Sequence, residues 1–336
     1  MEIYLVGGAV RDELMGRPRG DRDFVVLHAT AEEFAAAHEG ARIVGRKGVT
    51  FIWRGEEYTL SEAPDIEADL ACRDLTVNAL ARDSGGRLHA LPSALDDLER
   101  RALRPVSREN FLADPLRVLR AARFAACLPD FSSTPELVSA MRAAAPLLGE
   151  PAAERAGVEL RKACACPAPH RFFDLLAEAG CLAPWFVEFE ESPRAHDAAR
   201  AAEAVAHEAS GDPLTVWMAM CHVLAPAQAE ALGERLMLPI VWRKAARAAS
   251  EELPLLMRYA ELSAREKAEL LPRLHVLELF DQAVAVAQTL VLGFEAGRAR
   301  ADKAAVLAVR LPARERGRGA ASGELLRFLR ERALSG

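Results

Sequence analysis

Two carboxylates stand two residues apart near the N-terminus, in the segment GDRDFVV. Asp21 and Asp23 fall on a predicted strand, so their side chains are expected to share one face. Paired carboxylates are hard oxygen ligands, which suit Mg²⁺ better than a soft metal. A divalent ion held there could bridge the phosphates of a nucleotide. Two acidic residues at a solvated strand end are the alternative, and the pair alone does not exclude it.

A Gly-Gly step and an arginine precede the carboxylate pair. Gly7 and Gly8 follow an apolar segment and enter a predicted helix, and Arg11 lies one turn later. Free N–H groups at a helix start favour a phosphate, and a guanidinium fork could bind the same anion. A tight turn would also explain the glycines. Together with the two aspartates, however, the pattern favours a nucleoside triphosphate held over Mg²⁺.

Two later segments add polar residues for a nucleotide. In CRDLTVNALA, Arg73 is expected to contact a phosphate or a base, and Asp74 and Asn78 are expected to hold ribose hydroxyls. A salt bridge and a cap at a helix start are the structural alternative for these three residues.

The segment ADPLRVLRAARFAA places a carboxylate one turn before two arginines. Arg117 and Arg120 share a helix face, and Asp114 precedes them. A carboxylate that accepts from N4 beside a guanidinium that donates to N3 would select cytosine, and adenine after a small shift. Asp114 followed by proline is also a common helix start, and the two roles are compatible. Arginines that serve only as surface charges are the alternative for Arg117 and Arg120.

These segments, in this order, resemble the motifs of class II tRNA nucleotidyltransferases and of their bacterial poly(A) polymerase relatives. LVGGAVRDELMGRPRGDRDF is similar to the opening motif, CRDLTVNALA to RRDxxxNA, and ADPLR to EDxxR. The resemblance implies nucleotidyl transfer to the tRNA acceptor end without a nucleic-acid template, with CTP and possibly ATP as donors. It also implies Mg²⁺ on Asp21 and Asp23. Two positions depart from the motifs, because Cys72 replaces an arginine and Ala113 replaces the glutamate.

The number of nucleotides added is a separate question. Full CCA-adding members carry a long loop between the first two motifs, whereas YTLSEAPDIEADL passes directly from a hairpin strand to the motif helix. The resemblance therefore implies a CC-adding enzyme, after which a separate enzyme would add the terminal A. Full CCA addition is the alternative. A poly(A) polymerase or a non-catalytic tRNA-binding relative is less favoured, because the basic extensions are missing and both aspartates are present.

The pattern of strands and helices predicts an α+β protein. A small mixed sheet with helices forms a nucleotidyltransferase head at residues 1–105, and a helical neck for base recognition follows at 106–165. A helical body is expected at 166–255 and a helical tail, in contact with the tRNA elbow, at 256–336. Residues 64–83 read as one helix, and strand signals stop near residue 110.

The body and tail contain further polar motifs. His196-Asp197 and His222-Val223 suggest a degenerate HD-type module without the adjacent ligands that a metal needs, so no hydrolase activity is expected. Arginines between Arg310 and Arg332 could contact RNA phosphates, with a solvated helix face as the alternative.

The composition and charge of the chain limit which partners and which cellular location are expected. The net charge of −6 gives no overall basic field, although a local basic patch remains compatible with it. Neither a signal peptide nor an apolar run of about 20 residues is present, so a cytoplasmic protein without membrane contact is expected. The six cysteines are scattered and are expected to be reduced, buried thiols: Cys72, Cys127, Cys164, Cys166, Cys181 and Cys221.

Overall fold

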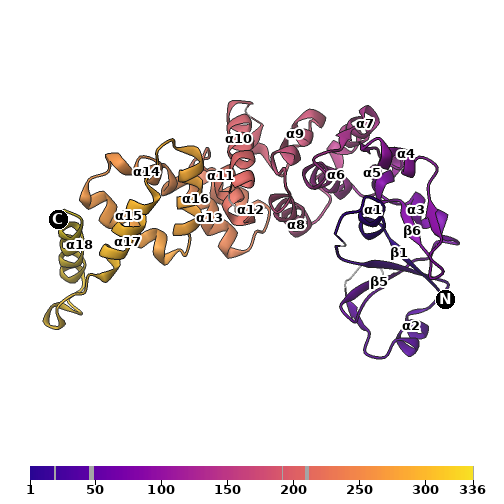
Figure 1. Ribbon diagram of the computed structural model, residues 1–336, viewed down its shortest axis with the longest axis horizontal. Helices are drawn as coiled ribbons and strands as arrows, with labels where there is room; N and C mark the ends of the chain where they lie inside the picture. The colour runs from indigo at the N-terminus through magenta and orange to yellow at the C-terminus, as the bar shows by residue number, and fades with distance from the viewer. Residues whose placement is uncertain (19, 45–48, 191, 209–211, 336) are drawn as a thin grey trace. The chain divides into compact units, whose positions relative to one another are not determined.

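The computed structural model describes residues 1–18, 20–44, 49–190, 192–208 and 212–335. Its main sheet lies in the N-terminal part of the chain, and the remainder is almost wholly helical (Figure 1). The predicted α+β class is therefore confirmed.

The main sheet has seven strands in the order β3-β4-β5-β2-β1-β6-β7. Strands β2 and β5 run parallel, and the other neighbouring pairs run antiparallel. The strand bounds are β1 Glu2–Val6, β2 Asp23–Leu27, β3 Arg42–Val44, β4 Thr50–Trp53, β5 Glu56–Leu60, β6 Leu80–Arg82 and β7 Leu88–Ala90.

Short helices cover both faces of this sheet. On one face α3 (Ile66–Ala71) buries Ile66 and Leu70 against alternate residues of β1 and β2. On the other face α2 (Ala31–Ala37) buries Phe34 against Val26, Phe51 and Tyr58. Helices α1 (Gly8–Leu14) and α4 (Ala94–Glu99) pack on β6. The alternating burial fixes which strand residues point into each layer.

The single helix expected over residues 64–83 is wrong in its second half. Helix α3 begins after the side chain of Asp65 caps its first turn, and it ends at Ala71. A 3-10 turn follows at Thr76–Asn78, and Leu80–Arg82 is strand β6. Because β6 lies between β1 and β7 and is covered by α1 and α4, its apolar residues are buried whatever their period.

Beyond residue 105, the regular elements of the described residues are helices and one short strand. Ser132–Ser133 forms β9, which pairs in parallel with β8 (Ala102–Leu103), so strands do not stop at residue 110. The helices are α5 Arg108–Ala113, α6 Leu116–Cys127, α7 Pro135–Ala144, α8 Ala153–Cys164, α9 His170–Ala179, α10 Ser192–Glu208, α11 Pro213–Cys221, α12 Pro226–Arg235, α13 Ile240–Glu251, α14 Leu253–Met257, α15 Ala264–Val276, α16 Phe280–Leu290, α17 Ala296–Ala308 and α18 Ala320–Leu334.

Contacts divide the chain into two compact units. Unit 1 comprises residues 1–121, 128–150 and 178–181, and unit 2 comprises 122–127, 151–177 and 182–336. The finer division into head, neck, body and tail stays a prediction.

The cysteines differ from expectation. Cys127 and Cys166 form a disulfide, and Cys72 is exposed, whereas Cys164, Cys181 and Cys221 are free and buried as predicted. The pattern of scattered cysteines could not reveal that two of them, 39 residues apart, come together. Within the described ranges, none of the helices combines the length and apolar character needed to cross a membrane.

Candidate nucleotide-binding site

The turn between β1 and α1 requires glycine at its first position. Gly7 has φ +68° and ψ −128°, and it caps the start of α1. A Cβ placed on Gly7 would lie 3.1 Å from Nη1 of Arg73, so a side chain would displace that guanidinium. Gly8 has less need of glycine, because its added Cβ would meet Nη2 of Arg11 at 3.4 Å. The bare backbone at Gly7 therefore lets Arg73 approach the turn closely.

A buried chain of polar contacts links the three predicted motifs. Nη1 of Arg11 donates to Oδ1 of Asn78 at 2.7 Å, and Nδ2 of Asn78 donates to Oδ1 of Asp74 at 3.1 Å. Nε and Nη2 of Arg120 lie 2.8 and 2.7 Å from Oδ2 of Asp74. Arg11 also pairs with Asp12. Four of the residues selected from sequence thus form one hydrogen-bonded network.

Asp74 is held as a carboxylate in this network. Burial alone would raise its pKa, because the charged form loses water. The Arg120 charge and donors from Asn78, Arg120 and the Leu75 backbone together outweigh burial and lower the pKa to about 2. Both carboxylate oxygens of Asp74 therefore accept hydrogen bonds from the protein. The predicted ribose contact of Asp74 and Asn78 stays a prediction, and binding there would require an exchange of partners.

Arg73 carries a donor without an acceptor. Its Nη2 pairs with Oδ2 of Asp69 at 3.0 Å, whereas its Nε is buried and has no hydrogen-bond partner among the described residues. A buried unpaired N–H costs about 1–3 kcal/mol. This donor belongs to the side chain whose Nη1 lies beside Gly7, so the turn combines an open backbone with a guanidinium that keeps one unpaired N–H.

The predicted base-reading residues surround the start of α6. Oδ1 of Asp114 accepts from the Leu116 backbone N–H at 3.3 Å, which confirms the local capping role. Arg117 and Arg120 both lie on α6 and are partly buried. Arg120 is bound to Asp74, whereas no partner for the Arg117 side chain is found in the described part of the chain. Base contacts by Asp114, Arg117 and Arg120 stay predictions.

Asp21 and Asp23 lie at the start of β2, and both are exposed. The strand begins at Asp23, so Asp21 precedes it and the expected placement of both on one strand is only half right. Asp23 lies opposite Val6 of β1 and Glu57 of β5. No cluster of three or more histidine, cysteine or acidic side chains suited to a metal is found in the described residues.

The two carboxylates of Asp21 and Asp23 fit Mg²⁺ in the number of ligands that they offer. Mg²⁺ is usually bound through one or two carboxylates, and phosphates and water complete its octahedral shell. Two exposed aspartates, without a third protein ligand among the described residues, match that chemistry better than a closed structural site.

Sequence reasoning missed several polar residues that hold the motifs in place. Nδ2 of Asn110 donates to the carbonyl oxygens of both Ala71 and Arg73, each at 2.8 Å. The hydroxyl of Thr76 donates to buried Asp97 at 2.8 Å, and Nε of Arg104 donates to the same carboxylate at 3.1 Å. Asn110 at the first turn after the Ser107 cap was a weak signal, since amides there often bond to nearby backbone.

Two family models match the chain. The model described as "Poly A polymerase head domain" matches residues 3–60, and the one described as "Probable RNA and SrmB- binding site of polymerase A" matches residues 130–192. The first match contains the Gly7 turn and the aspartate pair.

Full-length relatives extend this similarity. The chain is 36% identical over 301 residues to the CCA-adding enzyme of Pseudomonas putida, an alignment that covers 82% of this chain and 80% of that protein. This chain belongs to the class II tRNA nucleotidyltransferases. Within this family it is also 38% identical over 275 residues to the CCA-adding enzyme of Bordetella bronchiseptica, covering 74% and 71% of the two proteins.

Solved structures agree with the class II nucleotidyltransferase fold. The Thermotoga maritima CCA-adding enzyme, solved in complex with tRNA, superposes with a TM-score of 0.72 at 19% identity and covers 100% of this chain and 88% of that one. A CCA-adding enzyme solved with CTP gives a TM-score of 0.70 at 19% identity, covering 100% and 87%. At these identities the likeness supports the fold alone.

Proposed function

We propose that this chain transfers cytidine monophosphate from CTP to the 3′ end of tRNA and releases pyrophosphate. The supporting observation is the Gly7 turn, where a positive φ, the close approach of Arg73 and its unpaired Nε form a place for an anion. The relatives named as CCA-adding enzymes support the identity of the substrates.

In this proposal Asp21 and Asp23 hold Mg²⁺, which, when bound, offsets the charge of the phosphates. The exposed position of both carboxylates leaves room for a triphosphate beside them. Arg73 binds a phosphate through the donor that lacks an acceptor. The tRNA 3′-oxygen forms a bond to the α-phosphorus, the bond to the β-phosphate oxygen breaks, and the hydroxyl proton passes to solvent. Positioning and electrostatic stabilisation supply most of the acceleration in such reactions.

Base selection falls to the start of α6. Of Arg117 and Arg120, only Arg120 has a partner among the described residues, so the Arg117 guanidinium is available to donate to N3 of cytosine. Asp114 lies one turn earlier and would accept from N4. Arg120 is bound to Asp74, so we assign it to the support of Asp74 ahead of any contact with the base.

Two products remain candidates. Addition of CC alone is the form predicted from the short link between the motifs, and in the structure only residues 61–65 separate β5 from α3. Full CCA addition, with ATP as the last donor, is the second candidate, and the names of the relatives favour it. In the first case a separate enzyme would supply the terminal A.

A primer-extension experiment distinguishes these products. Purified protein with Mg²⁺ would be given three tRNA transcripts: one without the CCA end, one ending in CC and one complete. Each would receive CTP, ATP or both, and products would be resolved to a single nucleotide. Extension by CC, with no addition of A to the second transcript, would establish CC addition. Extension through the terminal A would establish CCA addition, and no extension of any transcript would contradict the enzymatic proposal.

A further inference from the structure

One side-chain amide ties the segment of Arg73 to helix α5. Nδ2 of Asn110 donates to the carbonyl oxygens of Ala71 and Arg73, each at 2.8 Å. Asn110 is partly buried on α5, and all three residues belong to unit 1. Because an amide nitrogen carries two N–H groups and both have acceptors here, Asn110 fixes two points of the backbone at once.

The amide completes the hydrogen bonding of the turn that follows α3. The last carbonyl groups of a helix lack donors from the helix itself. Within the turn the N–H of Cys72 donates to the carbonyl oxygen of Asp69 at 3.0 Å. Asn110 supplies the donors for the later carbonyl groups, those of Ala71 and Arg73. The backbone that carries Arg73 is therefore held by a side chain from another helix.

The chain after Arg73 is held by other contacts. The N–H of Val106 donates to the carbonyl oxygen of Asp74 at 3.1 Å, and the Asp74 carboxylate is bound by Arg120. Removal of the Asn110 amide thus releases the backbone of Arg73 while the contacts of Asp74 stay in place.

The main chain of Asn110 serves the other side of the candidate site. Its carbonyl oxygen accepts a hydrogen bond from the N–H of Asp114 at 3.1 Å. Asp114 is the residue proposed to accept from N4 of cytosine. One residue outside the three motif segments therefore joins the proposed phosphate contact to the proposed base contact.

The Arg73 guanidinium lies in a narrow place. Its Nη2 pairs with Asp69 at 3.0 Å, and a Cβ on Gly7 would lie only 3.1 Å from its Nη1. A shift of the Arg73 backbone by a few tenths of an ångström would therefore change how the guanidinium meets the Gly7 turn.

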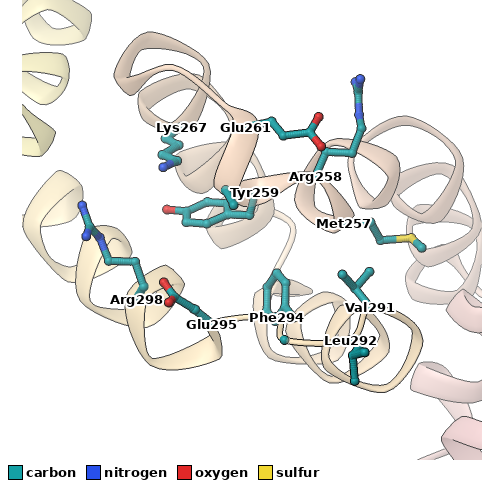
Figure 2. A pocket seen from close by; sticks show the side chains of 12 residues that line it. Met257, Arg258, Tyr259, Glu261, Lys267, Val291, Leu292, Phe294, Glu295 and Arg298 are labelled. Carbon is teal, nitrogen blue, oxygen red and sulfur yellow. The ribbon is translucent and has the colours of Figure 1, made fainter.

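A hollow in unit 2 is a weaker candidate for a further site. It has a volume of about 530 Å³ and lies between the ends of α14 and α16 and the starts of α15 and α17 (Figure 2). Lys267 lies over the ring of Tyr259, and Arg298 pairs with Asp302 at 3.1 Å. Because these cations already have partners, the hollow does not indicate a ligand of defined charge.

We propose that Asn110 is a positioning residue that sets the affinity for CTP by fixing the backbone of Arg73. This inference rests on the proposed function and adds to it a residue that does not touch the nucleotide. A guanidinium binds a phosphate best when its planar donors are already in place. A contact that is made equally before and during the reaction affects binding and leaves the rate of the bound complex unchanged.

The test compares CTP binding with the rate of the bound complex. Equilibrium dialysis with Mg²⁺ and without tRNA gives the Kd for CTP, and single-turnover extension of tRNA at saturating CTP gives the rate. In N110A, and in the isosteric N110D that lacks both donors, the Kd is expected to rise about tenfold, whereas the rate changes less than about twofold.

Ser107→Ala is the matched control. It removes the side chain that caps α5 at 3.1 Å from the Asn110 backbone N–H, and it leaves the Asn110 amide in place. The melting temperature should fall by about 2–4 °C, and the Kd for CTP should stay unchanged.

A double-mutant cycle with Arg73→Gln tests the route of the effect. If Asn110 acts through Arg73, adding N110A to R73Q should raise the Kd less than about twofold further, because the two changes remove the same contact.

The outcomes decide the role of Asn110. A rise in Kd in N110A and N110D that disappears in the R73Q background supports the proposal. An unchanged Kd overturns it, as does an equal rise in S107A or a full further rise in R73Q. Asn110→Ser keeps one donor and serves if the other variants fail to fold: an intermediate Kd supports the proposal, and a wild-type Kd overturns it. A wild type that binds CTP but does not extend tRNA would contradict the proposed function alone, because the Kd comparison still stands.

Discussion

Asp74 and the Asp21–Asp23 pair are carboxylates of the same domain in opposite surroundings. Asp74 is 4% exposed and receives hydrogen bonds from Arg120, Asn78 and the Leu75 backbone. Asp21 and Asp23 lie exposed at a strand start, without a third metal-binding neighbour among the described residues. The carboxylate of Asp74 is satisfied by donors of the protein, whereas Asp21 and Asp23 are proposed to hold Mg²⁺. Stability and activity should therefore respond to different substitutions.

The largest expected effect is on activity at the exposed pair. Asp21→Asn and Asp23→Asn, made separately, should each lower the single-turnover rate of cytidine addition by about 10³-fold, because an amide does not offset the charge of a bound cation. Both side chains are exposed, so the free energy of unfolding should change by less than about 0.5 kcal/mol. Urea unfolding and single-turnover extension measure the two quantities. A large loss of stability would contradict the comparison.

Asp74→Asn should mainly lower the free energy of unfolding, and this effect should be smaller than the loss of activity expected for Asp21 and Asp23. The substitution leaves Arg120 without its charged acceptor in a buried site and should cost about 2–3 kcal/mol of unfolding free energy. Asp130→Asn is the control, because Asp130 is 57% exposed and pairs with Arg17 and Arg101 at the surface, where about 0–1 kcal/mol is expected.

The pH dependence of that loss tests its cause. The folded pKa of Asp74 is about 2, below its unfolded value near 3.8, so the stabilisation is present above pH 4 and disappears as the pH falls toward 2. The shift corresponds to about 2 kcal/mol. The difference in unfolding free energy between the wild type and D74N should therefore shrink from pH 6 to pH 3. A difference that stays constant would assign the loss to packing.

Gly7→Ala should give the smallest effect, and it should change both the stability and the activity. A side chain at φ +68° is strained by about 1 kcal/mol, and the added Cβ lies 3.1 Å from the Arg73 guanidinium. We expect a modest loss of stability and a rise in KM for CTP. Gly149→Ala is the control, since Gly149 has open space around it and no positive φ. Equal effects of Gly7→Ala and Gly149→Ala would contradict a special role for the Gly7 turn.

Local patterns predicted much of this head. The strand expected in GDRDFVV, the helix expected after Gly7 and Gly8 and the hairpin strand expected before the motif helix are all present, because each is determined by residues close in sequence. Leu80 misled the prediction because it continues the helical spacing of Ile66 and Leu70. A strand buried on both faces lacks the alternation of apolar and polar residues that would distinguish it from a helix.

The members of the hydrogen-bonded network were predictable from the sequence, but their pairings were not. The motif segments predicted that Asp74, Asn78 and Arg120 would all contact a nucleotide. That Arg120 would bind Asp74, 46 residues away, depends on how α6 packs on the head, and no local spacing encodes it. The same holds for Asn110, whose two carbonyl acceptors belong to a segment 37–39 residues earlier.

Unit 1 is assembled from three separated stretches, and this has a consequence for biosynthesis. Strand β8 receives its partner β9 only after residue 133 has been made, and Arg104 meets Glu136 later still. The last stretch of the unit, residues 178–181, follows a long segment of unit 2. A nascent chain that ends before residue 106 thus lacks the later stretches of the unit and depends on continued translation to cover the apolar surface they pack against. A fragment cut at residue 105 would remain in that unfinished state and is expected to aggregate.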